Sequence, residues 1–296
     1  MFFNIPETKK KRVIINTDAK NEVDDQYAIV HALLTESFDL RGLIAAHFGS
    51  KKSPHSMQDS YDEIMLLLQL MDKQGTVRVE KGALTPIPDE STPVDSAGAR
   101  LIIEEALRED DRRPLYIAFL GPLTDMASAL LLEPSIAERD IKVVWIGGGA
   151  WPSGNSEYNL HNDIKAANVV MRSSVEVWQI PQNVYRMMPV SFAELTRKVR
   201  PCGEVGRYLV DNLIEFNNMA PARPVEFRVL GDSPAIGVMM NDNCGRWNYK
   251  PAPEFEDGMH YIHNGKNRPI RVYENIDNRF ILEDFYAKLQ DFAENK

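Results

Sequence analysis

The sequence predicts an α/β protein with an open, mostly parallel sheet flanked by helices. Short apolar runs rich in β-branched residues alternate with longer helical patterns through the first two-thirds of the chain, which is typical of β-α-β units. No repeat, low-complexity linker or break in composition interrupts the 296 residues. We therefore expect a single domain that covers residues 1–296.

The elements of this sheet follow from the apolar runs in chain order. Strands are predicted at residues 13–16, 40–47, 76–79, 115–120, 143–146, 175–180 and 270–273. Helical patterns lie at residues 24–35, 57–71, 98–107 and 123–132, and a last amphipathic helix follows the final strand. Beyond Arg186 the alternation loosens into helices at 192–200 and 203–217, so residues 187–260 are expected to cap the sheet.

The charge and the cysteines narrow the class of partner. A formal net charge of -9 and a pI near 5.3 argue against electrostatic binding of nucleic acid or of an anionic membrane surface. A small ligand, uncharged or cationic, is the simpler expectation. Cys202 and Cys244 form no C-x-x-C pair, and the sequence shows neither a signal-peptide core nor a run of about 18 apolar residues. We expect a reduced, cytoplasmic chain without a membrane partner.

Three carboxylates, Asp18, Asp24 and Asp25, crowd into the loop after the first predicted strand, N-T-D-A-K-N-E-V-D-D-Q (16–26). Ligands of open α/β sheets bind at the carboxyl ends of the strands. Grouped carboxylates repel one another unless a cation or protons neutralise them, and an oxygen-only set suits Ca²⁺ or Mg²⁺. The alternative is a solvated helix N-cap made by Asp24 or Asp25, and the loop alone does not decide between the two.

Three further segments stand at predicted strand ends. The turn F-L-G-P-L-T-D-M-A (119–127) supplies backbone carbonyls, which Ca²⁺ accepts as ligands. The glycine-rich segment V-V-W-I-G-G-G-A-W-P-S-G-N-S-E-Y-N (143–159) presents Asn155, Glu157 and Asn159, whose oxygens suit sugar hydroxyls. It lacks the G-K-[ST] ending of a phosphate loop, which makes a phosphate cradle the weaker interpretation. The last segment, R-V-L-G-D-S-P-A-I (228–236), places Asp232 ahead of a helix, where an isolated aspartate is most often a cap.

Taken together, the four segments resemble the calcium-dependent nucleoside hydrolases, the inosine-uridine ribohydrolase family. That family carries D-x-D-P-G-x-D-D, T-G-P-L-T-N, M-G-G…G-N…E-F-N and H-D in this order. Here the order reads N-T-D…V-D-D, L-G-P-L-T-D, I-G-G-G…G-N-S-E-Y-N and L-G-D, and the matches span residues 13–236. The resemblance implies the Rossmann-like sheet of the nucleoside hydrolase fold and, since relatives form dimers and tetramers, a homo-oligomer.

The resemblance also implies roles for individual residues. Ca²⁺ would be held by the side chains of Asp18, Asp25 and Asp232 and by the carbonyl oxygen of Leu120. The sugar would be held by Asp24, Asn155, Glu157, Asn159 and, at the 3′-hydroxyl, Asp232. Asp18 would be the general base that deprotonates a Ca²⁺-bound water.

The departures from the family pattern concern the first loop and the leaving group. The loop is longer than the family's, Asn16 stands where the family has its first Asp, and Ser50 replaces the usual Asn after Gly49. Gly231 occupies the position of the His that protonates the departing base in many relatives, and glycine donates no proton. The candidates to take over its role are His161 and His47, or Tyr185 and Trp151 through hydrogen bonding or base stacking, although a lone His or aromatic is more often structural.

The leading hypothesis is therefore a Ca²⁺-dependent hydrolase that cleaves the N-glycosidic bond of a ribonucleoside or a related riboside. The alternative from another class is a metal-dependent ribose-binding or sugar-binding protein with little or no turnover, which Gly231 and Ser50 favour. A hydrolase of a phosphorylated or O-linked substrate is a third possibility. The acidic pI and the missing phosphate loop count against a phosphorylated one.

Overall fold

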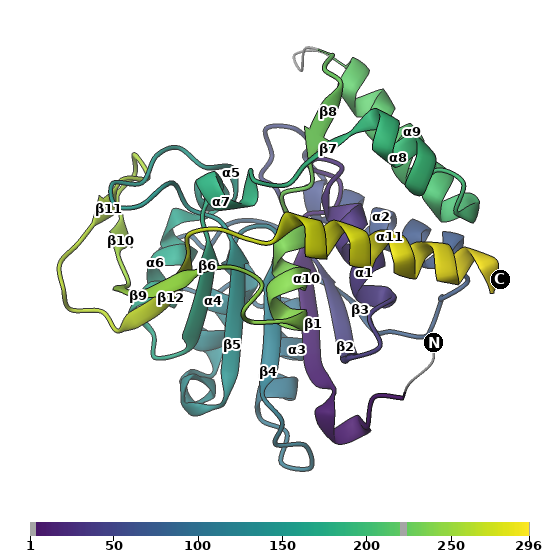
Figure 1. Ribbon diagram of the computed structural model, residues 1–296. Coiled ribbons are helices and arrows are strands. Elements are labelled where there is room, and N and C mark those ends of the chain that lie inside the picture. The colour runs from purple at the N-terminus through teal and green to yellow at the C-terminus, as the bar shows by residue number, and fades with distance from the viewer. Residues whose placement is uncertain (1–3, 220–223, 296) are drawn as a thin grey trace.

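The computed structural model describes residues 4–219 and 224–295, and its centre is an eight-stranded sheet (Figure 1). The strand order is β3-β2-β1-β4-β5-β6-β12-β9. All neighbours are parallel except β9, which runs antiparallel to β12. The strands are β1 (Lys11–Thr17), β2 (Phe38–Ala45), β3 (Val79–Lys81), β4 (Leu115–Phe119), β5 (Ile141–Ile146), β6 (Glu176–Ile180), β9 (Trp247–Pro251) and β12 (Pro269–Tyr273). This order confirms the predicted α/β class with an open, mostly parallel sheet.

Helices bury both faces of the sheet, which explains why its central strands are apolar at consecutive positions. Successive side chains of β1 point to opposite faces, so Val13 and Ile15 join one apolar core and Ile14 joins the other. The first core includes residues of α1 (Asp25–Leu33), α2 (Ser56–Leu70), α9 (Gly203–Asn218), α10 (Ser233–Met240) and α11 (Asn278–Glu294). The second includes residues of α3 (Ala97–Ala106), α4 (Thr124–Leu132) and α6 (Ile164–Arg172).

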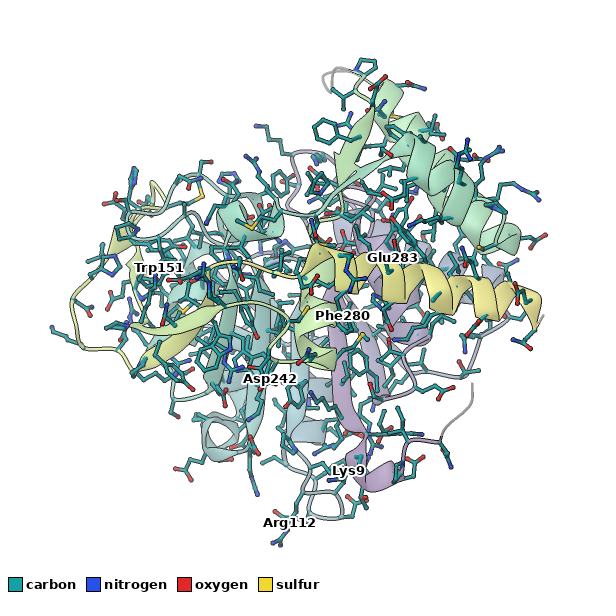
Figure 2. The ribbon with its side chains drawn as sticks, viewed as in Figure 1. Lys9, Arg112, Trp151, Asp242, Phe280 and Glu283 are labelled. Carbon is teal, nitrogen blue, oxygen red and sulfur yellow. The ribbon has the colours of Figure 1, made fainter. Side chains whose placement is uncertain are left out.

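A small lobe lies beyond the carboxyl ends of the central strands, at the top of Figure 1. It consists of β7 (Pro189–Ser191), α8 (Phe192–Lys198), α9 and β8 (Phe227–Val229), with β7 and β8 paired antiparallel. Lys9 and Arg112, labelled at the bottom of Figure 2, mark the opposite end of the sheet, where strands β1 and β4 begin. Within the predicted capping region 187–260, α10 packs on the sheet and β9 joins it, so the lobe itself ends near residue 229.

Short elements complete the chain. They are the 3₁₀ helices η1 (Glu7–Lys9) and η2 (Pro134–Glu138), the helices α5 (Tyr158–Asn162) and α7 (Gln182–Tyr185), and the hairpin of β10 (Glu254–Phe255) and β11 (Tyr261–Ile262). One strand prediction needs correction, because β3 begins at Val79, where the predicted strand 76–79 ends. The sequence did not predict the sheet strand β9 or the short strands β7, β8, β10 and β11. Across residues 4–219 and 224–295, no helix combines the length and the apolar character that a membrane crossing requires.

Candidate functional site

Three carboxylates meet where two helices begin. Asp24 and Asp25 stand at the start of α1, and Asp232 directly precedes α10. One oxygen from each of the three lies within 4.8 Å of the others, and Asp25 and Asp232 are buried. The two helix N-termini direct positive partial charge at this point, which favours carboxylates there. The loops after β1 and before α10, far apart in the sequence, thus form one acidic cluster.

The contacts of this cluster argue against the capping alternative. Asp24 and Asp232 occupy N-cap positions, yet neither side chain accepts a capping hydrogen bond from its own helix. Instead Asp24 Oδ2 accepts the Gly231 N–H at 2.9 Å across the two loops, and Asp25 Oδ1 accepts the Thr17 hydroxyl at 2.5 Å. Asp25 and Asp232 also share a hydrogen bond, so the three side chains interact with each other and with neighbouring loops rather than with their own helix ends.

Asp18 lies on the same cavity but outside the group of three. Its side chain is 2% exposed, and Oδ2 accepts from Asn21 Nδ2 at 3.1 Å. A Cβ on Gly121 would lie 3.0 Å from Asp18 Cγ, so the glycine after β4 allows the aspartate to pack there. The division between Asp18, Asp25 and Asp232 as metal ligands and Asp24 as a sugar ligand stays a prediction.

The electrostatics of the four aspartates show the cost of grouping them. Burial raises the pKa of Asp18, Asp24 and Asp232 well above the ordinary value, and the neighbouring carboxylates raise these pKa values further. Burial also raises the pKa of Asp25 to about 6, against the hydrogen bond from Thr17, which lowers it. The cluster must therefore hold protons or a cation at neutral pH.

A cavity of about 1020 Å³ opens above this cluster, beneath the lobe. The four aspartates, Leu120, Glu157 and Asn159 line it from the sheet side. The lobe contributes an apolar wall that includes Phe216, Val225 and Phe227, the last of them 50% exposed. One side of the cavity is thus acidic and polar, and the side facing the lobe is apolar enough for an aromatic group.

Asn159 connects the ends of two neighbouring strands. Its Nδ2 donates to the Leu120 carbonyl after β4 and to the Ile146 carbonyl at the end of β5, both at 2.8 Å. A carbonyl oxygen has two lone pairs, so the Leu120 oxygen keeps one for a further partner. The arrangement is compatible with the predicted backbone ligand, while the role itself stays a prediction.

Glu157 is buried and its acceptor positions are filled. Oε1 accepts from the Asn159 N–H at 3.1 Å and the Tyr185 hydroxyl at 3.0 Å, and Oε2 accepts from the N–H groups of Gly148 and Leu160 at 2.8 and 2.9 Å. A carboxylate offers about four acceptor positions, so a sugar hydroxyl would have to displace one of these donors. Burial raises the pKa of Glu157.

Asn155 has a supporting position in the glycine-rich loop. Its Oδ1 accepts from the Ala150 N–H at 2.9 Å, and its Nδ2 donates to Gln182 Oε1 at 2.8 Å. Asn155 is not among the residues that line the cavity, whereas its neighbour Ser156 is. Sugar binding by Asn155 and by Glu157 therefore stays a prediction.

Two of the four proposed replacement acids lie outside the cavity wall. His47 is buried, its Nε2 lies 2.9 Å from the Thr124 hydroxyl, and burial lowers its pKa to about 4. Trp151, labelled in Figure 2, donates to Gln179 and packs against Tyr261 with ring centroids 5.2 Å apart. His161 and Tyr185 do line the cavity.

Tyr185 fills the space beside Gly231. A Cβ on Gly231 would lie 3.1 Å from Tyr185 Cδ2 and 3.2 Å from Asp24 Oδ2, so a histidine there would require the tyrosine ring to move. The absence of a side chain at Gly231 thus gives the Tyr185 ring its place. Sequence reasoning named both residues but missed their contact, because they lie 46 positions apart and no local pattern joins them.

A further pair that the sequence interpretation did not connect is Asn16 and Asp125. Asn16 Nδ2 donates to Asp125 Oδ2 at 2.8 Å, and Asp125 Oδ1 accepts from the Ser96 hydroxyl at 2.7 Å and the Ala83 N–H at 2.9 Å. The resembled family has Asp at the first position and Asn at the second. The two side-chain types have therefore exchanged places across one buried hydrogen bond. The available signal was the final Asp in L-G-P-L-T-D.

Comparisons with known proteins give the same relationship. The sequence model described as inosine-uridine preferring nucleoside hydrolase matches residues 13–282. Among individual relatives, the probable uridine nucleosidase 2 of Oryza sativa subsp. japonica is 24% identical over 237 residues, which cover 70% of this chain and 66% of the rice protein, just under two thirds of its length. The pyrimidine-specific ribonucleoside hydrolase RihA of Salmonella paratyphi A is 25% identical, covering 95% of this chain and 99% of that protein.

A solved structure supports the fold independently. The purine-preferring ribonucleoside hydrolase from Gardnerella vaginalis superposes with a TM-score of 0.78 at 20% sequence identity. The superposition covers 97% of this chain and 100% of that one. At this identity the likeness establishes the shared fold alone.

Proposed function

Because the chain belongs to the inosine-uridine preferring nucleoside hydrolase family, we propose that it hydrolyses the N-glycosidic bond of a ribonucleoside or a related riboside with the help of Ca²⁺. The observation that carries the proposal is the buried cluster of Asp24, Asp25 and Asp232 at the floor of a cavity large enough for such a substrate. By resemblance we also propose a homo-oligomer, and from the two cysteines, which form no C-x-x-C pair, a cytoplasmic location.

The residues present fit a hard cation. The donors are carboxylate oxygens, with the Leu120 carbonyl beside them, which is the ligand type that Ca²⁺ prefers. The raised pKa values of Asp18, Asp24 and Asp232 reflect burial and mutual repulsion, and a divalent charge would relieve that repulsion. When bound, Ca²⁺ supplies positive charge that neutralises the aspartates and acidifies a water molecule.

The chain's own residues supply the remaining steps. Asp18 takes the proton of the attacking water from its position on the cavity wall. Asp24, Asn159 and Asp232 hold the ribose hydroxyls at the floor of the cavity. The carboxylates around the sugar stabilise the positive charge that develops as the bond to the base breaks.

The leaving group departs on the side of Tyr185 and His161. Both residues line the cavity and carry a proton-donating group. The Tyr185 hydroxyl is committed to Glu157, and burial with the Glu157 charge raises its pKa, which makes it a weak acid. His161 is exposed and is the stronger candidate to protonate a base.

The test is chelator-sensitive hydrolysis of p-nitrophenyl β-ribofuranoside, whose leaving group needs no proton, with inosine and uridine assayed alongside. We expect nitrophenol release with Ca²⁺, loss of release with chelator, and loss in Asp25→Asn. The matched control is Asp257→Asn, because Asp257 is an exposed aspartate that does not line the cavity. Activity that persists in chelator would exclude the Ca²⁺ mechanism.

A second function, sugar binding without turnover, is favoured by one observation. Gly231 cannot donate a proton, and Tyr185 occupies the space that an acid at this position would need. In that case ribose and Ca²⁺ would bind in calorimetry, and no riboside would be cleaved under any condition.

A further inference from the structure

Three cationic side chains line the same cavity as the aspartates: Lys51, Arg186 and Arg228. Within residues 4–219 and 224–295, none of the three forms an ion pair with a carboxylate. Other surface arginines of this chain do so readily, as Arg172 does with Glu90 and Glu254. The chain has a net charge of -9, yet unpaired cations around a cavity favour an anionic group at that place.

Arg228 is held in place by two contacts. Its Nε donates to Asn217 Oδ1 at 2.8 Å, and its guanidinium lies 5.5 Å from the centre of the Phe216 ring. These two contacts fix the plane of the guanidinium. Nη2 is buried and has no hydrogen-bond partner in the described part of the chain. Arg228 nevertheless lines the cavity, and arginine donates its strongest hydrogen bonds to anionic oxygens. An anionic group there would bind the cavity side of the guanidinium, and a small movement of the side chain would bring the enclosed Nη2, whose lack of a partner is costly, to it as well.

Arg186 and Arg228 both line the cavity, and each follows or precedes one partner of the contact between Tyr185 and Gly231. Arg186 directly follows Tyr185, whose ring packs against Gly231, and Arg228 precedes Gly231 by three residues on β8. The sugar end of a substrate would lie over the aspartates, where an anion would be repelled. An anionic group is therefore accommodated only at the end remote from the ribose.

We propose that the cavity binds a riboside whose aglycone carries an anionic group, a carboxylate or phosphate, held by Arg228 with Arg186. This inference rests on the proposed function and specifies its substrate class. It revises the expectation of an uncharged or cationic ligand, which considered only the charge of the whole chain. The same chemistry at another place, a phosphate on the 5′ carbon of the sugar, is distinguished by the probes below.

Three pyridinium ribosides test the proposal, because they share one leaving ring that departs neutral and needs no proton. Nicotinamide riboside carries a carboxamide, nicotinate riboside carries a carboxylate at the same ring position, and nicotinamide mononucleotide carries a phosphate on the sugar instead. Affinity for the full-length protein with Ca²⁺ is measured by calorimetry, and hydrolysis by release of the free pyridine. We expect nicotinate riboside to bind at least about tenfold more tightly than nicotinamide riboside, because its carboxylate can accept a charge-assisted hydrogen bond.

The variants assign that preference to the arginines. Arg228→Gln should reduce the tenfold preference to about onefold to threefold while leaving nicotinamide riboside affinity unchanged. Arg228→Lys should retain part of it, because lysine keeps the charge without the forked geometry. Arg197→Gln is the control, since Arg197 is exposed on α8 and does not line the cavity. Unchanged thermal midpoints exclude misfolding as the cause.

The outcomes separate this inference from the proposed function. Equal affinity for the two ribosides, or a preference that survives both Arg228→Gln and Arg186→Gln, would overturn the inference. Stronger binding of the mononucleotide than of nicotinate riboside would move the anion to the sugar and overturn it as well. If carboxylate preference depends on Arg228 but no riboside is ever cleaved, the inference on ligand class stands and the hydrolase proposal fails.

Discussion

Asn16 and Asp125 form a buried hydrogen bond in which the resembled family has Asp at the first position and Asn at the second. Exchanging the two residues tests whether both arrangements stabilise the fold equally. Asn16→Asp places a second carboxylate at the 2.8 Å contact with Asp125, and both residues are at most 2% exposed. At an effective dielectric constant of about 20, two unit charges 2.8 Å apart repel by about 6 kcal/mol. Protonating one ordinary aspartate at pH 7 costs about 4 kcal/mol, since each pH unit above a pKa of about 3.9 adds about 1.4 kcal/mol.

Protonation is the cheaper solution, so the single variant should fold with one carboxyl protonated and donating to the other. Its free energy of unfolding should fall by about 4 kcal/mol at pH 7 and by only about 1.5 kcal/mol at pH 5. The sign follows because a group with a raised folded-state pKa loses stability as pH rises. Asp125→Asn alone should cost less than about 2 kcal/mol. Asn16 Oδ1 has no hydrogen-bond partner among the described residues, so a flip of the Asn16 amide would turn this oxygen toward the new amide at position 125.

The double variant, Asn16→Asp with Asp125→Asn, should recover to within about 1 kcal/mol of the wild-type protein at both pH values. Urea denaturation followed by circular dichroism measures all four proteins. The reasoning is refuted if the free energy of unfolding of Asn16→Asp lies within about 1 kcal/mol of the wild-type value at pH 7. It is also refuted if the double variant is no more stable than Asn16→Asp. Either result would mean that the contact does not decide which residue carries the charge.

Three further predictions concern the cavity. Ca²⁺ affinity measured by calorimetry should fall as pH is lowered through about 6, because protons compete for Asp25 and its neighbours, whose pKa values burial raises; an affinity independent of pH between 5 and 8 would contradict this. Without Ca²⁺, the free energy of unfolding should fall as pH rises from about 4 to 7, because Asp18 and Asp232 have raised pKa values in the folded state and lose their protons in this range at a cost to the fold. Added Ca²⁺ should remove most of that slope, because it neutralises the aspartates. Gly231→His should reduce riboside hydrolysis through collision with the Tyr185 ring, and Tyr185→Ala added to it should restore activity; continued inactivity of a folded double variant would argue against the steric explanation.

Much of the fold could be predicted because its signals are local. The runs around Val13 and Val143 lie in strands buried on both faces, so their apolar character alone identified them. The edge strand β9 was missed because its residues are all half-buried or exposed. Without a buried face, such a strand shows no alternation of apolar and polar residues in the sequence. The predicted strand at 76–79 was displaced for a related reason. The strand that pairs with β2 consists of Val79, Glu80 and Lys81, and the last two are charged residues that do not resemble a strand in the sequence.

For the site, the sequence identified the acidic loops but not their contacts. Asp18, Asp24, Asp25 and Asp232 all line the cavity, as their positions at strand ends suggested. The fit of Tyr185 against Gly231 and the Asn16–Asp125 exchange depend on contacts between distant segments, which no local spacing encodes. Net charge averages the aspartate floor with cations such as Arg228, so by itself it does not determine the charge of the ligand.

The hydrogen bonds of Glu157 bear on how the glycine-rich loop moves. The amides of Gly148, Asn159 and Leu160 all donate to this one side chain, and none of those bonds belongs to a strand ladder. Their protection from solvent exchange thus depends on a single carboxylate. In hydrogen–deuterium exchange, these amides should become labile together in Glu157→Ala while the amides of β5 stay slow, so that the loop opens as one unit separate from the sheet beneath it.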